Sequence, residues 1–174
     1  MLSLKGDKIN LRALESEDLD FLYELENNAD IWEISGTVTP YSKHVLKLYL
    51  ENAYRDIYDV KQLRLCICSK DRETVGLIDL FDFDPKNRRA GIGIVVLEAD
   101  KRNKGIGKEA IELLCKYAFS VLNLRQLFAN VGEDNKASIH LFKKIGFEIV
   151  GVKKDWILSE GTFKNEILLQ KINN

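Results

Sequence analysis

The feature that most constrains the fold is a series of three strand-like segments between residues 62 and 97, separated by very short connections. Each segment is rich in Val, Ile, Leu, Cys or Phe, and the turn sequences KDRE and DPKN lie between them. A parallel connection needs about a dozen residues or more, whereas antiparallel neighbours can be joined by a tight turn. We therefore expect antiparallel strands over QLRLCIC (62–68), TVGLIDLFDF (74–83) and AGIGIVVL (90–97).

Helix and strand patterns also occur on both sides of these segments. KINLRAL (8–14) alternates as a strand does, and Ser16 stands where it can cap a helix carrying Leu19, Leu22 and Leu25 on one side. The other expected elements are a loop over 27–42, helices over 43–55, 105–121 and 135–146, a strand over 125–131, and two final strands around the turn SEGT. The chain is expected to form a single α/β domain over residues 1–174 with a mixed sheet.

The charge balance excludes several classes of partner. Lys and Arg total 26 against 27 for Asp and Glu, so there is no basic excess to neutralise a nucleic acid or an anionic lipid surface. The longest apolar stretch, GIGIVVL, is far shorter than the ~20 residues of a membrane helix, and the amino end has no apolar signal region. We expect a cytoplasmic protein with neither nucleic acid nor membrane as partner.

The three cysteines predict no disulfide framework. Cys66 and Cys68 share one side of an expected strand, and Cys115 lies in an expected helix. The simplest interpretation is three reduced core thiols, and no cluster of His and Cys predicts a metal site.

The stretch KRNKGIGKEA (101–110) contains the pattern G-x-G-x-x-A. A dinucleotide fingerprint would place these glycines directly after the first strand of a βαβ unit, but here EADKRNK intervenes and the glycines come late in the chain. What remains is a glycine loop running into a helix start, where unpaired N–H groups can bind a pyrophosphate. Arg102, Lys104 and Lys108 add positive charge, although a solvated basic helix start is the alternative.

A second motif, NKASIHLFKKIGFEIVG, begins thirty residues after Gly105. With it the chain resembles the GNAT superfamily of acyl-CoA-dependent N-acetyltransferases. In that superfamily [RQ]-x-x-G-x-[GA] holds the CoA pyrophosphate, and N-x-x-[SA] followed by an aromatic, a basic residue and G-F lines the pantetheine and adenine side. Arg102, Gly105 and Gly107 fit the first pattern; Asn135, Ser138, Phe142, Lys144, Gly146 and Phe147 fit the second.

The resemblance covers nearly the whole chain and is closest to the spermidine and ribosomal-protein N-acetyltransferase branches, through LRALESEDL, GLIDLFDFDPKNRRAGIGI and YAFSVLNL. It implies a mixed, mostly antiparallel α/β (α+β) sheet with helices on both faces, in which strand 90–97 splays from strand 125–131. It also implies acetyl-CoA as co-substrate. The residues expected to bind it are Val95, Val96, Leu97, Arg102, Asn103, Lys104, Gly105, Ile106, Gly107, Lys108, Asn135, Ser138, Phe142 and Lys144.

Transfer to an amine requires a deprotonated nucleophile and a stabilised oxyanion. An alkylammonium with a pKa near 10.4 is only about one part in two thousand neutral at pH 7, so a base is useful. Asp79 is a candidate because it interrupts an apolar strand, unless it merely lies on the wet face of the sheet; Glu133 is a weaker one. Backbone N–H groups around Val96 are the expected oxyanion donors.

The resemblance also exposes a departure. In the spermidine-type relatives a tyrosine on the helix after the Asn motif is the expected acid for the leaving thiolate, but this chain has Phe142 there. Phenylalanine cannot donate a proton. Either the thiol, with a pKa near 8.5, leaves unaided, or the domain is a non-catalytic acyl-CoA-binding module. Tyr117 and Tyr41 are conceivable replacements.

The acceptor side is expected to be acidic. Residues 13–42 contain eight acids and no Lys or Arg, and in the superfamily this region forms the acceptor side. Glu33, Trp32 and Tyr41 are the expected substrate contacts, although Trp32 and Tyr41 can equally pin the loop to the core. A field of one sign favours a small polycationic amine; a protein amino terminus is the alternative. The apolar carboxy-terminal strands also allow a homo-oligomer.

Overall fold

The computed structural model describes residues 3–97 and 105–174. Its strands form one sheet in the order β1-β2-β3-β4-β5-β7-β6. Neighbouring strands are antiparallel except β4 and β5, which are parallel, so the expected mixed, mostly antiparallel sheet is confirmed. The strands are β1 (Ile9–Ala13), β2 (Leu63–Ser69), β3 (Thr74–Asp84), β4 (Arg89–Val96), β5 (Gln126–Gly132), β6 (Glu148–Ser159) and β7 (Thr162–Ile172).

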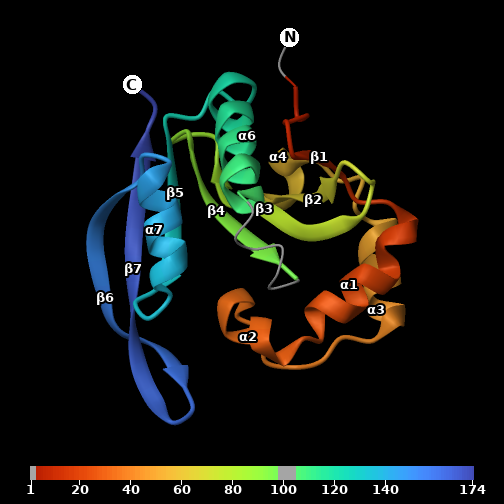
Figure 1. The fold of residues 1–174 in the computed structure, drawn as a ribbon, viewed down its shortest axis with the longest axis horizontal. Helices are drawn as coiled ribbons and strands as arrows, with labels where there is room; N and C mark the ends of the chain where they lie inside the picture. The colour runs from red at the N-terminus through yellow and green to blue at the C-terminus, as the bar shows by residue number, and fades with distance from the viewer. Residues whose placement is uncertain (1–2, 98–104) are drawn as a thin grey trace.

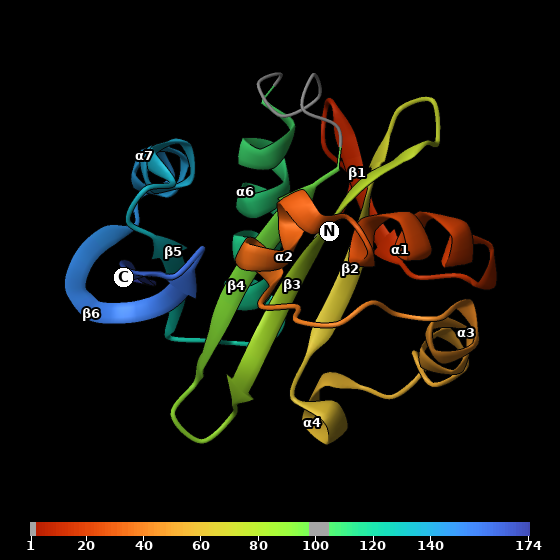
Figure 2. The same ribbon diagram turned by 90° about the horizontal axis from the view of Figure 1, so that it is seen from below.

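Helices cover both faces of the sheet (Figures 1 and 2). They are η1 (Ser16–Asp18), α1 (Leu19–Glu26), α2 (Ala29–Ser35), α3 (Lys43–Glu51), α4 (Ile57–Val60), α6 (Ile106–Ser120) and α7 (Lys136–Lys144). Because strand side chains alternate between faces, β3 places Ile78 in the apolar cluster under α6 and α7, and Leu77 in the cluster under α1 and α3. The sheet therefore separates two layers of helix.

The segment expected as a loop over residues 27–42 contains helix α2. Its signals are local: the Asn28 side chain accepts a hydrogen bond from the Asp30 N–H, and Gly36 ends the helix with φ of 71°. Asparagine caps and a left-handed terminal glycine are ordinary helix boundaries, but the surrounding turn formers obscured them. The next helix is also shorter than expected, because α3 ends at Glu51 and a separate turn, α4, follows.

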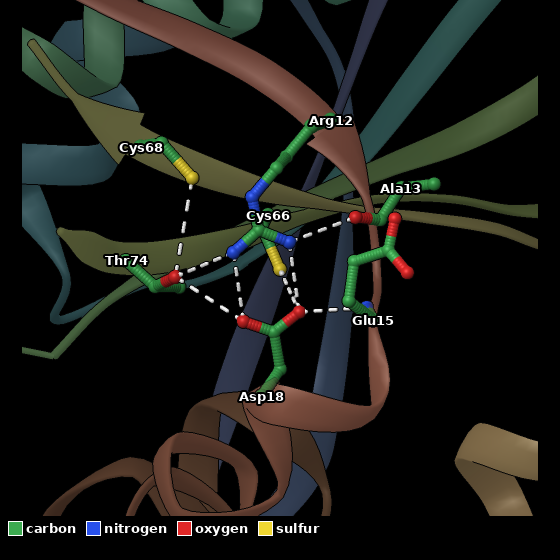
Figure 3. Close-up of polar contacts among 7 residues, drawn as sticks. All are labelled: Arg12, Ala13, Glu15, Asp18, Cys66, Cys68 and Thr74. Carbon is green, nitrogen blue, oxygen red and sulfur yellow. Dashed lines mark hydrogen bonds and ion pairs between the residues drawn. The ribbon is translucent and has the colours of Figure 1, made fainter. Parts of the chain in front are cut away.

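The first helix is anchored by a buried carboxylate, not by the expected Ser16 cap. Asp18 accepts two hydrogen bonds from the Arg12 guanidinium, both at 2.8 Å, and one from the Glu15 N–H at 2.8 Å. The Thr74 hydroxyl also donates to Asp18, as Figure 3 shows. The Asp18 side chain is only 5% exposed. This cluster joins β1, η1 and β3, and so fixes where α1 leaves the sheet.

The cysteines lie where the strand pattern predicts. Cys66 and Cys68 belong to the same apolar cluster on the α1 and α3 side, and both are free and buried, as is Cys115. Burial raises the pKa of Cys66 and of Cys115 to about 12, so these thiols stay protonated near neutral pH and are poor nucleophiles. Across residues 3–97 and 105–174 no helix is both long and apolar enough to cross a membrane.

Candidate active site

The two parallel strands at the centre of the sheet separate shortly after they meet. β4 and β5 pair over Arg89–Gly91 and 126–128, and beyond this point their described residues have no pairing to each other. Figure 1 shows the two strands diverging as a V, with α6 and α7 on one side. The expected splay is thus confirmed. Beyond these paired residues, the facing backbone edges of β4 and β5 are therefore not joined to each other in the described sheet.

An aromatic pair marks the point of divergence. Phe81 of β3, Gly91 of β4 and Phe128 of β5 occupy one row of the sheet, and the two rings meet edge to face with centroids 5.7 Å apart. A Cβ on Gly91 would lie 2.3 Å from the Phe81 ring, which no real side chain allows. Gly91 is therefore needed for space, so that the rings on either side can touch.

The start of α6 provides the anion-binding geometry that the glycine motif predicts. Gly105 has φ of 78°, a conformation that favours glycine, and the Glu109 N–H donates to the Gly105 carbonyl at 3.1 Å. By helix geometry the N–H groups of 106–108 then have no intrahelical acceptor. These groups and the positive end of the helix dipole suit a pyrophosphate. Arg102, Asn103 and Lys104 lie outside the described residues.

The opposite side of this helix start is fixed to β1. The Glu109 carboxylate accepts hydrogen bonds from the N–H groups of Asp7, Lys8 and Ile9, at 2.8, 2.9 and 2.8 Å. Burial alone raises the pKa of Glu109, but these bonds outweigh it and hold the pKa below its ordinary value. The helix end that is proposed to bind phosphate is therefore hydrogen-bonded to the segment that leads into β1.

Two residues of the glycine motif have packing or pairing roles of their own. Gly107 is buried, and a Cβ there would lie 3.3 Å from Cδ2 of Leu141 on α7. Gly107 thus permits close packing of α6 and α7. The exposed Lys108 ammonium lies 3.7 Å from the Glu112 carboxylate, so its charge is partly compensated one turn along the helix.

The Asn motif forms the start of α7. The Asn135 side chain accepts a hydrogen bond from the Ser138 N–H at 3.2 Å, so the two residues are joined as a helix cap. Both are half-buried, whereas Lys144 at the far end of the helix is exposed. The expected contacts of Asn135 and Ser138 with the pantetheine side are therefore compatible with a capping function.

Phe142, expected as a cofactor contact, is a core residue of α7. Its side chain is 3% exposed and packs edge to face on Phe147, with ring centroids 5.0 Å apart. A ring with so little accessible surface offers a ligand almost no contact area. The apolar substitution suits this position because a buried hydroxyl without a partner is unfavourable.

The candidate base Asp79 is held by an arginine. Arg64 of β2 donates from Nε and Nη2 to the two Asp79 oxygens, at 2.9 and 3.0 Å, and from Nη1 to Glu26 at 3.0 Å. The Arg64 guanidinium also lies 5.8 Å from the Tyr49 ring centroid. Asp79 lies on the helix-covered side that β-strand alternation predicts, but both its oxygens already accept hydrogen bonds. In this arrangement it is a partner of Arg64 instead of an available base.

Part of the expected oxyanion site is engaged within the sheet. The Leu97 N–H donates to the Val75 carbonyl at 3.0 Å, so Leu97 is not the expected backbone donor to a ligand. Val96 lies opposite Gly76, and a Cβ on Gly76 would be 2.3 Å from the Val95 carbonyl oxygen. Because backbone N–H groups alternate between the two sides of an antiparallel strand, the Val96 N–H is directed toward the β5 side.

The three expected substrate contacts on the acceptor side have intramolecular partners. The Trp32 Nε1–H donates to the Glu26 carbonyl at 2.8 Å, which favours the interpretation that Trp32 pins the α1–α2 corner. Tyr41 is exposed, and its backbone bonds twice to the Asn27 side chain. Glu33 accepts hydrogen bonds from Lys164 and Ser159 of the carboxy-terminal hairpin.

Sequence reasoning missed the two cations on this side, Arg64 and Lys164. Each lies on a strand, where the alternation of side chains indicates a face but not a partner. Lys164 borders a surface pocket of about 510 Å³ whose other lining residues are Glu133, Asp134, Lys136, Asp155, Phe163 and Asn165. In the described parts of the chain no group of His, Cys, Asp and Glu is arranged to hold a metal.

Comparison with known proteins agrees with this geometry. A family model described as an acetyltransferase (GNAT) domain matches residues 8–148. The spermidine N(1)-acetyltransferase of Escherichia coli K12 is 31% identical over 160 residues, which is 91% of this chain and 83% of the relative. The spermidine N(1)-acetyltransferase of Vibrio cholerae is 28% identical over 82% of this chain and 80% of its own length.

Solved structures show the same fold. A crystal structure of spermidine N-acetyltransferase from Vibrio cholerae in complex with CoA and spermine superposes with a TM-score of 0.85, covering 96% of each chain at 24% identity. A dodecameric structure of that enzyme has a TM-score of 0.80 at 25% identity, covering 96% of this chain and 95% of the other. With a splayed β4–β5 pair beside a glycine-led helix start, and a family match over most of its length, the chain belongs to the GNAT acetyltransferases, enzymes that use acetyl-CoA to acetylate amines.

Proposed function

We propose that this enzyme acetylates a small polycationic amine, and that it does so by direct attack of the amine on the thioester of acetyl-CoA. The observation that carries the proposal is the divergence of β4 from β5, with α6 beside these strands and the acid-rich helix α2 at their open end (Figure 1). The chain is similar to two spermidine N(1)-acetyltransferases, and this similarity supports the same class of acceptor.

The acceptor-side charge is smaller than the sequence suggests, but it remains negative. Half of the eight acids in residues 13–42 are compensated by ion pairs: Asp18 with Arg12, Asp20 with Lys43, Glu26 with Arg64, and Glu33 with Lys164. Glu15, Glu17, Glu24 and Asp30 are exposed and have no ion pair within the described residues. Their field supports attraction of a cation, and its strength falls as salt is added.

The parts of the proposed active site have separate roles. Acetyl-CoA supplies the activated acyl group, and the N–H groups at the start of α6 would hold its phosphates, with the Asn135 end of α7 beside the pantetheine arm. The Val96 backbone remains the proposed oxyanion donor. Neither Phe142 nor Asp79 supports the expected acid or base role, so we propose that water takes the amine proton and that the thiolate leaves unassisted.

A small acceptor is favoured over a protein amino terminus by the position of α2. Glu33 of α2 is tied to Ser159 and Lys164 of the β6–β7 hairpin, so these two parts of the acceptor side are joined to each other. A protein substrate would need an open groove between them, whereas a small amine does not.

The test is thiol release from acetyl-CoA with a panel of cationic, neutral and anionic amines. The cofactor site is probed with Lys108→Glu, which places a negative charge beside the proposed phosphate site on an exposed residue. Lys116→Glu, exposed two turns along the same helix, is the matched control. Gly107 is unsuitable for a bulky block because it is buried against α7.

We expect turnover with spermidine-like amines. We also expect the KM for acetyl-CoA to be about tenfold higher in Lys108→Glu than in Lys116→Glu, because one unfavourable charge contact costs on the order of 1.4 kcal/mol. Equal turnover of neutral amines would contradict the electrostatic proposal. CoA binding without turnover of any amine would instead support the binding-module alternative that Phe142 raises.

We also propose that the chain self-associates through the carboxy-terminal hairpin. β6 is an edge strand, and several large apolar side chains of β6 and β7 are exposed: Ile149, Val150, Val152, Trp156, Leu158 and Phe163. Large apolar side chains exposed on and beside an edge strand are typical of an interface. Sedimentation of wild type and of Leu158→Glu measures this directly; a monomeric wild type contradicts it.

A further inference from the structure

Lys164 of β7 joins three separate parts of the molecule with one ammonium group. Its Nζ lies 2.9 Å from Oε1 of Glu33 on α2 and 2.8 Å from Oδ2 of Asp134, which precedes α7. The side chain of Lys164 is 29% exposed, against 40% for Glu33 and 59% for Asp134. Neither the family match nor the sequence motifs assign it a role.

The two partners of Lys164 belong to opposite sides of the proposed active site. Glu33 is on the helix of the acceptor side, and Asp134 is adjacent to Asn135, the cap of α7 on the proposed cofactor side. Figure 1 places α2 at the open end of the V, between the end of β4 and the β6–β7 hairpin. Lys164 therefore connects the acceptor-side helix α2 to the residue that precedes the cap of α7.

Helix α2 has little apolar contact to hold it there. Ile31 is its only buried residue, and fully burying one such side chain is a modest contribution. Among the described residues, its side chains make polar contacts to other elements through the Trp32 indole, which donates to the Glu26 carbonyl, and through Glu33, which accepts from Ser159 and Lys164. With so little burial, polar contacts have an unusually large share in setting the position of α2.

We propose that Lys164 is a positioning residue that holds α2 through Glu33 and thereby sets the affinity for the acceptor amine. This inference rests on the proposed function for its effect on catalysis, but the position of α2 can be measured separately. Lys164 is charged throughout the working pH range, because hydrogen bonds to Asp134 and Glu33 raise its pKa above the ordinary lysine value.

The experiment compares Lys164→Met, which keeps the length of the side chain and removes the charge, with Glu33→Gln and with the double variant. Lys164→Arg keeps the charge. Lys154→Met is the matched control, since Lys154 is exposed on the same hairpin and has no ion pair within the described residues. Hydrogen exchange of residues 27–42 reports how readily α2 opens, and steady-state kinetics report KM and kcat for the acceptor and for acetyl-CoA.

We expect faster exchange of residues 27–42 in Lys164→Met and an acceptor KM raised about three- to tenfold, as loss of an exposed ion-pair network allows. The kcat and the KM for acetyl-CoA stay near wild type, Lys164→Arg restores the acceptor KM, and the double variant is no worse than either single one. Lys154→Met behaves as wild type.

Three results would overturn the proposal: unchanged exchange of α2, a lower acceptor KM in Lys164→Met, or additive effects of Glu33→Gln and Lys164→Met. A lower KM would mean that Lys164 competes with the cationic substrate for the two carboxylates. If wild type acetylates no amine, the proposed function fails, and the exchange data alone then decide whether Lys164 holds α2.

Discussion

Two ion-pair clusters hold the two helices of the acceptor side, and they differ chiefly in burial. The Arg12–Asp18 cluster at the start of α1 contains a carboxylate that is 5% exposed, whereas the Glu33–Lys164–Asp134 cluster at α2 consists of side chains that are 29% to 59% exposed. A buried carboxylate that loses its partner is costly, but an exposed one is solvated by water. The first cluster is thus suited to fixing the fold, and the second to adjusting a local position.

The largest effect on stability is expected from Asp18→Ala, which removes the carboxylate of the buried cluster. The change leaves Arg12, Thr74 and the Glu15 N–H without their shared acceptor. Because Arg12 is itself 38% exposed and can turn to water, we expect the free energy of unfolding to fall by about 2–3 kcal/mol, less than for a fully buried pair. Urea denaturation measures it. A loss below about 0.5 kcal/mol would remove the distinction between the two clusters.

The pH dependence of stability provides a second test of the buried cluster. Burial raises the pKa of Asp18, but hydrogen bonds from Arg12 and Glu15 outweigh it, so the folded-state pKa lies below the unfolded value. The stability from Asp18 is therefore fully present above about pH 4 and is lost as pH falls through the folded pKa. The stability difference between wild type and Asp18→Asn should therefore stay constant down to about pH 4 and shrink as the pH falls further. A difference that stays constant below about pH 4 as well would contradict this.

Glu109 provides an intermediate case, because its carboxylate is half-buried and bonded to three backbone N–H groups. We expect Glu109→Gln to lower the free energy of unfolding by about 1–2 kcal/mol, since the amide has one acceptor oxygen where the carboxylate has two. Chemical denaturation at pH 7 measures it, with Glu112→Gln on the same helix as control. If Glu109→Gln lowered the free energy of unfolding more than Asp18→Ala does, the size of the loss would not follow the burial of the carboxylate.

The smallest effect on stability is expected from Lys164→Met. The side chains of Glu33, Lys164 and Asp134 are 29% to 59% exposed, so the melting temperature should stay within about one degree of wild type even while the acceptor KM changes. Differential scanning calorimetry on the Lys154→Met control sets the baseline. A melting temperature that drops as far as in Asp18→Ala would place the α2 cluster among the contacts that fix the fold.

The sequence predicted the layers of the fold better than the chemistry of the site. Short turns and the alternation of apolar residues were sufficient to predict the sheet. The resemblance carried by the two motifs was sufficient to predict the splay of β4 from β5. Both features depend on the order of elements along the chain. Helix α2 was missed since its caps, Asn28 and Gly36, lie among other turn formers.

Side-chain partners were harder to predict for a physical reason. The partner of Asp79 is Arg64, fifteen residues away on the adjacent strand, and the partner of Glu33 is Lys164, 131 residues away. Charge patterns reveal that an acid is present but not which base approaches it in three dimensions. The acceptor side therefore looked like a uniform acidic surface, whereas half of its acids are compensated.

The pairing between β4 and β5 is short, and this has a consequence for how the two halves of the sheet are held together. Arg89, Ala90 and Gly91 are the residues of β4 that pair with β5 in the described sheet, and the Phe81 and Phe128 rings meet beside this pairing. Because so few residues pair there, strands β1–β4 and β5–β7 depend for their relative position on the apolar core under α6 and α7, which contains residues of both halves.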